Sequence, residues 1–252
     1  GMASNEVVMA VTALPNGGIV AGGDFLTAGG VSASCIAQWN GTSWAPRGSG
    51  MNSRVRALIT LPNGDVVAGG DFTTAGGVSA TYIARWNGAS WAPLGSGMNF
   101  PVKALAALQN GDLVAGGVFD TAGGASANRV ARWNGTSWAT LGSGIDFSVD
   151  ALTTMPNGDL VAGGDFTTAG GVSANRIARW NGTSWSALGS GVNFDVKALA
   201  TLPNGDLVAG GWFGTASANY LARWNGASWA PLGSGMPGYV LSLVTLQNGH
   251  LV

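Results

Sequence analysis

Hydrophobic and polar positions in this chain recur as short apolar runs separated by Asn-Gly pairs and Gly-rich loops. Within residues 145–191, apolar and small residues predominate in 149–155, 160–164, 177–180 and 185–188. Each run has the length of a typical strand, and no segment shows the i, i+3, i+4 period that a helix needs. The pattern therefore predicts four short strands in this segment and no helix.

Asn-Gly pairs separate the first predicted strand from the second and the third from the fourth. Asn157-Gly158 follows the first strand, and Asn181-Gly182 follows the third. Asn-Gly between apolar runs is the strongest short hairpin signal, because both central residues of a type I′ turn need positive φ. We therefore expect two antiparallel hairpins with type I′ turns, joined by a polar loop at about 167–175.

The four-strand pattern repeats along the chain. Tryptophan recurs every 47 residues from Trp39 to Trp180, and the next equivalent, Trp224, follows after 44. Two of the repeats, 51–97 and 145–191, differ at only 13 of 47 positions. The chain therefore divides into five full repeats and a half repeat: 6–50, 51–97, 98–144, 145–191, 192–235 and 236–252.

Repeats of four antiparallel strands in about 45 residues are typical of β-propeller blades. A β-solenoid is the alternative, but its coils are usually shorter and lack two Asn-Gly hairpins per unit. We predict an all-β protein with a single β-propeller domain over residues 1–252. The repeats favour six blade positions with the sixth half built, and a five-bladed ring is the alternative.

One stretch of the fifth repeat carries a family resemblance. Residues 196–211, VKALATLPNGDLVAGG, resemble the bacterial delta-sixty propeller repeat, as do the DFTT and RIAR segments of other repeats. The glycine pair Gly163-Gly164 and the fourth-strand Trp185 are also similar to kelch repeats, although Trp180 stands where kelch repeats carry Tyr. The resemblance covers nearly the whole chain and implies a propeller whose first strand is innermost. Such propellers serve many roles, so it implies little about function.

Composition narrows the classes of function. Charged residues make up 9% of the chain, against about 25% in an ordinary soluble domain. The net charge of −1 supports neither nucleic-acid nor anionic-membrane binding, and no apolar stretch approaches the ~20 residues of a membrane helix. The single Cys35 excludes an intramolecular disulfide, and the single His250 excludes a His-based metal cage. Abundant Gly, Ser, Thr and Asn with few Lys and Glu favour an extracellular location.

Periodic side chains are predicted to hold the repeats together. Ten of the eleven tryptophans flank the second hairpin in pairs, and we interpret them as packing rather than as sugar platforms, since each buries roughly 150–250 Å². The second to fifth repeats each carry an Arg just before the third-strand Trp and an Asp just after the first turn. We interpret these side chains as a ladder of contacts between blades or between Arg and Trp. A Phe at the end of the second strand is assigned to the core of each repeat: Phe25, Phe72, Phe119, Phe166 and Phe213.

The loops divide unequally between the two ends of each repeat. One end carries tight Asn-Gly turns, and the other, which we call the long-loop face, carries the second-to-third strand loops and the connections between repeats. Binding residues concentrate on loops held by a rigid scaffold, so we predict any site there. The candidate residues on this face are Phe100, Phe147, Phe194, Asp71, Asp165, Asn175 and Trp212.

Two alternatives concern these candidates. Asp71 and Asp165 could ligate calcium, but D-x-D-x-D spacing is missing and we interpret them as turn caps. Trp212 lies outside the tryptophan pairs, in a loop three residues shorter than its equivalents. It either fills the space that the missing residues leave or borders a notch that suits a sugar or peptide. Exposure of Trp212 distinguishes the two.

These observations favour a non-catalytic scaffold for binding or adhesion, with a glycan or peptide as partner and no cofactor or metal. The alternative is a structural, engineered or truncated propeller without a ligand, which assembles through its incomplete blade with residues 249–252 as a pairing edge. We expect no enzyme, because no Ser-His-Asp arrangement or phosphate-binding loop is recognisable in the sequence.

Overall fold

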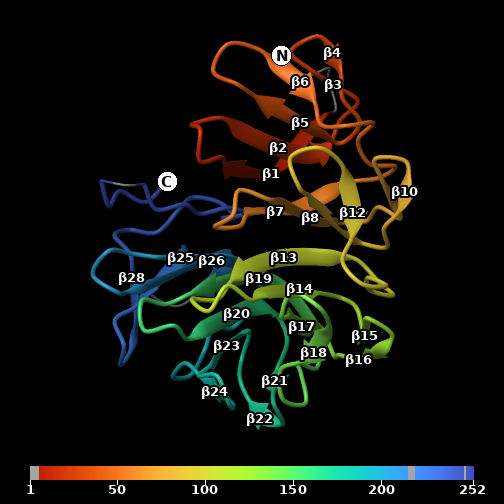
Figure 1. The fold of residues 1–252 in the computed structure, drawn as a ribbon. Helices are drawn as coiled ribbons and strands as arrows, with labels where there is room; N and C mark the ends of the chain where they lie inside the picture. Colours follow the sequence, from red (N-terminus) through yellow and green to blue (C-terminus); the bar gives the residue numbers. More distant parts are fainter. Residues whose placement is uncertain (1–5, 215–218, 247) are drawn as a thin grey trace. The chain divides into compact units, whose positions relative to one another are not determined.

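The computed structural model describes residues 6–214, 219–246 and 248–252, and the described part contains strands and no helix. The longer strands form five antiparallel sheets of four strands, one for each full repeat (Figure 1). The chain folds as two compact units, the first made of residues 1–126 and 132–139 and the second of 127–131 and 140–252. The predicted all-β propeller repeat is therefore confirmed at the level of the single blade.

Each sheet follows the same order along the chain. The first two strands of the five sheets are β1 (Val7–Ala13) and β2 (Ile19–Asp24), β7 (Val55–Thr60) and β8 (Val66–Gly70), β13 (Val102–Ala107) and β14 (Leu113–Gly117), β19 (Ser148–Thr154) and β20 (Leu160–Asp165), β25 (Val196–Thr201) and β26 (Leu207–Gly214). The third and fourth strands are β5 (Ile36–Trp39) and β6 (Trp44–Pro46), β11 (Ile83–Trp86) and β12 (Trp91–Pro93), β17 (Val130–Trp133) and β18 (Trp138–Thr140), β23 (Ile177–Trp180) and β24 (Trp185–Ala187), β27 (Asn219–Trp224) and β28 (Trp229–Pro231).

The loop between the second and third strands contains a small hairpin that the sequence analysis describes only as polar loop. In the fourth repeat Thr168–Ala169 pairs with Val172–Ser173, and both turn residues, Gly170 and Gly171, have positive φ. A two-residue Gly-Gly turn with this geometry is typical of tight hairpins. Within the described residues, the hairpins of this kind are β3 (Thr27–Ala28) and β4 (Val31–Ser32), β9 (Thr74–Ala75) and β10 (Val78–Ser79), β15 (Thr121–Ala122) and β16 (Ala125–Ser126), β21 (Thr168–Ala169) and β22 (Val172–Ser173).

The expected type I′ turns at Asn-Gly are wrong. Gly158 has a φ of 90°, but no Asn appears among the described non-glycine residues with positive φ. The N–H of Gly158 donates to the carbonyl of Met155 at 2.9 Å, and the N–H of Met155 donates to the carbonyl of Asp159 at 2.8 Å, which closes a three-residue loop, 156–158. Proline fixes φ near −65° and so prevents a type I′ turn, while the αL glycine is typical of a three-residue hairpin loop.

Successive sheets within each unit pack through glycines of the second strand. A Cβ at Gly163 would lie 2.5 Å from Val196 Cγ1, and one at Gly210 would lie 2.4 Å from Val240 Cγ1. The fourth-strand tryptophans add a hydrogen bond to the preceding repeat; for example, Trp185 Nε1 donates to the Leu141 carbonyl at 2.9 Å. The interpretation of the paired tryptophans as packing is confirmed.

The prediction for the periodic phenylalanines is confirmed, and the prediction for the periodic Arg and Asp residues is wrong. The predicted core is confirmed, because the side chains Phe25, Phe72, Phe119, Phe166 and Phe213 are all buried. The Arg–Asp ladder between blades is wrong, because each pair lies within one repeat: Arg85–Asp65, Arg132–Asp112, Arg179–Asp159 and Arg223–Asp206. The Arg on the third strand reaches the turn that opens the neighbouring second strand of the same sheet.

The half repeat 236–252 continues the packing but forms no named strand in its described residues. Its Val240 contacts Gly210, and Thr245 and Leu251 form an isolated antiparallel bridge. Val244 and Val252 exchange two backbone hydrogen bonds of 2.9 Å. One edge of residues 249–252 is therefore paired within the chain, and the number of blade positions at closure stays a prediction.

No helix in the described residues is long and apolar enough to cross a membrane.

Candidate functional site

The long-loop face is held in place by a polar residue from the connection between repeats. In the second unit Asp146 Oδ1 accepts hydrogen bonds from the N–H groups of Thr167 and Thr168 at 3.1 and 3.0 Å. Asn52 does the same for Thr73 and Thr74 in the first unit. Burial raises the pKa of Asp146, but the hydrogen bonds from Thr168 and Thr167 outweigh it and leave the pKa lowered.

These caps were missed by the sequence analysis. Their signal is the Asn or Asp that recurs at the same place in each connection: Asn52, Asn99, Asp146 and Asn193. Their amide or carboxylate oxygens satisfy loop N–H groups, which is a structural role. The loops that carry the candidate residues are therefore anchored rather than loose.

The two predicted aspartates bind arginine, so their interpretation as turn caps is wrong. Arg56 donates to both carboxylate oxygens of Asp71, at 2.6 and 2.7 Å. Asp165 forms an ion pair with Arg176, which precedes β23. Both aspartates are acceptors in ion pairs that cross between neighbouring strands of a sheet. Among the described residues no three of His, Cys, Asp or Glu gather where they could hold a metal ion.

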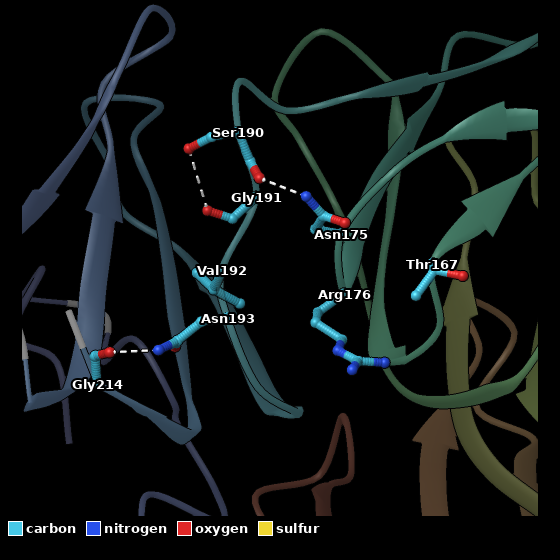
Figure 2. Close-up of a pocket in the computed structure, with 8 residues that line it drawn as sticks. All are labelled: Thr167, Asn175, Arg176, Ser190, Gly191, Val192, Asn193 and Gly214. Atoms are coloured by element: carbon cyan, nitrogen blue, oxygen red, sulfur yellow. Dashed lines mark hydrogen bonds between the residues drawn. The ribbon is translucent and has the colours of Figure 1, made fainter.

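Asn175 lines a groove of the second unit, of about 610 Å³, together with Arg176. Its side-chain amide donates to the carbonyl of Ser190 at 3.1 Å. Figure 2 shows Asn175, Arg176 and Thr167 on one side of the groove and Asn193 and Gly214 on the other. Arg176 is the one ionisable side chain among the described lining residues, and its charge is paired with the carboxylate of Asp165 beside the groove.

The three predicted phenylalanines are exposed. The exposed fraction is 49% for Phe100 in the first unit, and 57% and 59% for Phe147 and Phe194 in the second. Phe147 borders a smaller cavity of about 260 Å³, which shares Thr167 and Arg176 with the groove of Figure 2. Phe147 and Arg176 therefore face one continuous depression on the long-loop face.

Trp212 is exposed to 49% and belongs to a cluster with Tyr220 and Tyr239, which we call the aromatic cluster. The Trp212 and Tyr239 rings lie 5.3 Å apart at 34°, and Tyr220 meets Tyr239 edge-on at 5.2 Å. Tyr239 is 64% exposed. The alternative in which Trp212 merely fills the shortened loop is not supported, because half of its surface faces solvent.

Lys197 supports the aromatic cluster from the first strand of the fifth repeat. Its Nζ lies 5.3 Å from the centre of the Trp212 ring, 2.6 Å from Asp150 and 3.1 Å from Asp195. Burial lowers the pKa of Lys197, but the bonds to Asp150 and Asp195 outweigh it, so the pKa is raised and the ammonium persists. A cation fixed over the ring holds Trp212 in one orientation.

Sequence reasoning placed Trp212 but missed its partners. Tyr239 lies in the half repeat at a position that holds Asp195 and Ser148 in the preceding repeats, so no periodic signal marks it. The arrangement offers flat aromatic surface beside fixed carboxylates and amides. These are groups that bind a ligand with both apolar and hydroxyl faces.

Several solved structures have a similar fold. The WD40 repeats of RRP9 and the structure of U3-55K each give a TM-score of 0.65 at 15% identity, covering 97% of this chain and 72% and 73% of theirs. The extracellular domain of the one-component system BT4673 of B. thetaiotaomicron gives 0.56 at 11% identity, covering 99% of this chain and 37% of that chain. Identities this low show the fold alone. A comparison with curated proteins finds no match.

Two sequence families match the repeats. Residues 61–88 match a beta-propeller domain of unknown function, DUF5122. Residues 88–248, well over half of the chain, match the family described as the Rax2 C-terminal beta propeller domain. This match spans the third, fourth and fifth sheets and the aromatic cluster. The chain therefore belongs to the Rax2 C-terminal beta propeller domain family.

Proposed function

We propose that this chain is a non-catalytic binding module of an extracellular protein, and that it binds a glycan at the aromatic cluster. The observation that carries the proposal is the exposure of Trp212. No other repeat has a tryptophan at the equivalent position. A buried tryptophan would serve packing, as Trp185 does. An exposed one that is held by Lys197 and Tyr239 is already ordered before a ligand arrives, which lowers the entropic cost of binding.

The surroundings of Trp212 favour a glycan over a peptide. Aromatic rings offer an apolar face to the C–H faces of a sugar, while oxygens nearby accept its hydroxyls. The carboxylate of Asp195 follows directly on the exposed Phe194, and Asn193 lines the groove of Figure 2. The face thus alternates aromatic and hydrogen-bonding groups, which matches the alternation on a sugar ring.

The proposal of a binding module without catalysis rests on the reactive side chains. Cys35 is buried, and burial raises the pKa of its thiol, so little thiolate forms at neutral pH. The imidazole of His250 lies next to Asn248, two residues away in the same turn. We further propose that the repeats are of the delta-sixty type, with kelch-like features in the Gly163-Gly164 pair and Trp185.

Titration of the protein with a panel of neutral oligosaccharides and peptides tests the proposal. We expect an oligosaccharide to bind, and Trp212→Ala to weaken it at least tenfold with an unchanged melting temperature. Leu26→Ala, which removes an exposed apolar side chain from the equivalent loop of the first repeat, is the matched control. Binding of a peptide alone, or binding that survives Trp212→Ala, would overturn the assignment of a glycan to this cluster.

A second candidate function is self-association through the half repeat. Leu241 and Val252 expose 68% and 67% of their surface in a segment whose repeat equivalents pack against another sheet. Leu241→Lys would then lower the mass measured by light scattering across a concentration series. A mass that is independent of concentration in the unmodified chain would exclude this candidate.

A further inference from the structure

Every full repeat contains two Asn-Gly pairs, and the two lie in different turns. One pair connects the first and second strands, and the other connects the third and fourth. We call them the first-turn pair and the second-turn pair. In an Asn-Gly pair the side-chain amide can react with the main-chain nitrogen that follows, because glycine has no side chain to shield that nitrogen. The chain therefore presents one reactive dipeptide in two settings.

The first-turn pairs are held at both reacting groups. The N–H of Gly158 donates to the Met155 carbonyl at 2.9 Å. The amide nitrogen Nδ2 of Asn157 donates to the Asp159 carboxylate at 2.8 Å, and Oδ1 of Asn157 accepts the N–H of Asp159 at 3.1 Å. The glycine N–H donates to a backbone carbonyl in every first-turn pair and in the half repeat: Gly17, Gly64, Gly111, Gly158, Gly205 and Gly249.

The second-turn pairs leave the glycine nitrogen open. Oδ1 of Asn181 accepts the N–H groups of Thr183 and Ser184 at 3.0 and 2.9 Å. Within the described residues, no group accepts the N–H of Gly182 or the Nδ2 hydrogens of Asn181. A Cβ at Gly158 or at Gly182 would meet nothing within 4 Å, so the two settings differ in hydrogen bonding and not in crowding. The second-turn asparagines share two N–H donors to Oδ1: Asn40, Asn87, Asn134, Asn181 and Asn225.

This difference bears on the cyclisation of asparagine. The glycine nitrogen loses its proton and attacks the side-chain carbon Cγ, so that a bond forms between them. The amide nitrogen takes up a proton and leaves as ammonia, and a cyclic imide results. Water then adds to one of the two imide carbonyls and opens the ring. The product is Asp, or the isomer in which the main chain runs through the side-chain carbons; solvent water is the co-reactant, and nothing is oxidised or reduced.

Two features of the second turn favour this reaction. Negative charge develops on Oδ1 of Asn181 during the attack, and N–H donors already aimed at that atom lower the barrier. The unbonded N–H of Gly182 also loses its proton more readily than one that donates to a carbonyl, which is the property that amide hydrogen exchange measures. In the first turn, the bond from Gly158 to Met155 must break before the nitrogen can react.

We propose that the second-turn asparagines are sites of spontaneous deamidation, and that hydrogen bonds protect the first-turn asparagines. Each event replaces a neutral amide with a carboxylate, on a chain whose net charge is −1. The Asp product can still accept the two N–H bonds, whereas the isomer lengthens the main chain of the turn by one carbon. The end of each sheet that carries the tight turns therefore gains negative charge with age. This inference does not rest on the proposed glycan site, which lies at the opposite end of the sheets.

Peptide mapping by mass spectrometry tests the proposal on the folded chain during incubation in mildly alkaline buffer. Water enriched in heavy oxygen marks each ring opening, so that conversion during the incubation is separated from earlier conversion. We expect Asp and its isomer to form at Asn181 at least tenfold faster than at Asn157, because only Gly158 must first break a hydrogen bond. Hydrogen exchange should likewise be faster at the Gly182 amide than at the Gly158 amide.

Two controls identify the fold as the cause. In the chain unfolded by urea, Asn157 and Asn181 should react at similar rates, since glycine follows both. In the folded chain, Asn181→Gln should slow the appearance of acidic species on ion exchange, because glutamine would have to form a larger and less favoured ring. Asn157→Gln should leave that rate unchanged. Melting temperatures within a few degrees of the parent exclude unfolding as the cause.

Two outcomes would overturn the proposal. Equal rates at Asn157 and Asn181 in the folded chain would show that the first-turn hydrogen bonds do not protect. A second turn that stays intact while the unfolded chain reacts would show that the turn keeps the Gly182 nitrogen away from Cγ of Asn181.

Discussion

The fourth and fifth sheets share their interior and differ at the long-loop face. Phe166 and Phe213 are both fully buried, and Gly163 and Gly210 both receive a valine of the next repeat. At the loop end, however, the ion pair of the fourth repeat is replaced in the fifth. Positions occupied by Asp165 and Arg176 in one sheet are occupied by Trp212 and Tyr220 in the other.

This difference separates the residues that build a blade from those that give it a surface. The interior accepts only apolar residues of similar size, such as Val66 and Leu160 at equivalent positions, because its groups are closely packed. The two positions lie at the loop end of the sheet, where Asp165 and Arg176 form an ion pair and Trp212 and Tyr220 each contact Tyr239. Chemistry on this face can therefore change from repeat to repeat without cost to the scaffold, and the following substitutions test that separation.

The largest effect is expected where the two sheets are identical. A Cβ at Gly164 would lie 2.0 Å from the Ser148 carbonyl, and one at Gly211 would lie 2.0 Å from the Asp195 carbonyl. Both atoms belong to backbone that cannot rotate away, so Gly164→Val and Gly211→Val should each destabilise by about 3 kcal/mol or more. Chemical denaturation measures the loss. Gly238→Ala, with no heavy atom within 4 Å of the new Cβ, is the control; a tolerated Gly164→Val would show that the interior is less rigid than described.

A smaller effect separates the two kinds of tryptophan. Trp185 is 5% exposed and donates one of the two hydrogen bonds that the Leu141 carbonyl accepts, the other coming from the Gly144 N–H. Trp185→Phe removes this bond and should cost about 1 kcal/mol. Trp212→Phe changes an exposed ring and should stay within about 0.5 kcal/mol. Equal losses in thermal unfolding would mean that Trp212 serves the scaffold as well, which would weaken its assignment to a site.

The blade was predictable from sequence because its signals are local and repeated. Alternation, Asn-Gly pairs and spacing gave the third strand of the fourth repeat, Ile177–Trp180, with its observed bounds. The turn type was wrong because only the glycine of each described Asn-Gly pair takes a positive φ, also in the third repeat, where Gln109 stands in place of proline. The small hairpin at Gly170-Gly171 was missed because two-residue strands carry too little hydrophobic pattern to register.

The site was predictable only in part, because its residues meet through the fold. The sequence indicated Trp212 because it departs from the repeat pattern. It indicated the three exposed phenylalanines because they recur at one position of the repeat. Lys197 reaches Trp212 from the first strand of the same repeat and Tyr239 reaches it from the half repeat, and sequence spacing does not indicate which of these side chains meet. The Asp165–Arg176 pair was likewise hidden, since its two members flank a loop whose hairpin brings them together.

The smallest effect concerns the residues that cap the loops. Asp and Asn, which have the same shape, occur at the same position in different repeats. Asp146 accepts N–H bonds from Thr167 and Thr168 in the fourth repeat, and Asn52 accepts the equivalent bonds in the second. The pKa of Asp146 is lowered below 3.8. A lowered pKa means that the carboxylate stabilises the folded state above that value, and that this contribution is lost as the pH falls through the folded pKa.

Asp146→Asn should therefore reduce the fall in melting temperature between about pH 6 and about pH 2, because the amide keeps its oxygen acceptor at every pH. Asn52→Asp should do the opposite and add acid sensitivity, since the Thr73 hydroxyl can donate to a carboxylate as that of Thr167 donates to Asp146. The two variants move the same quantity in opposite directions, so a general effect of net charge cannot imitate both. Parallel curves for the parent and both variants would contradict the capping role, and with it the view that these loops are anchored by their caps.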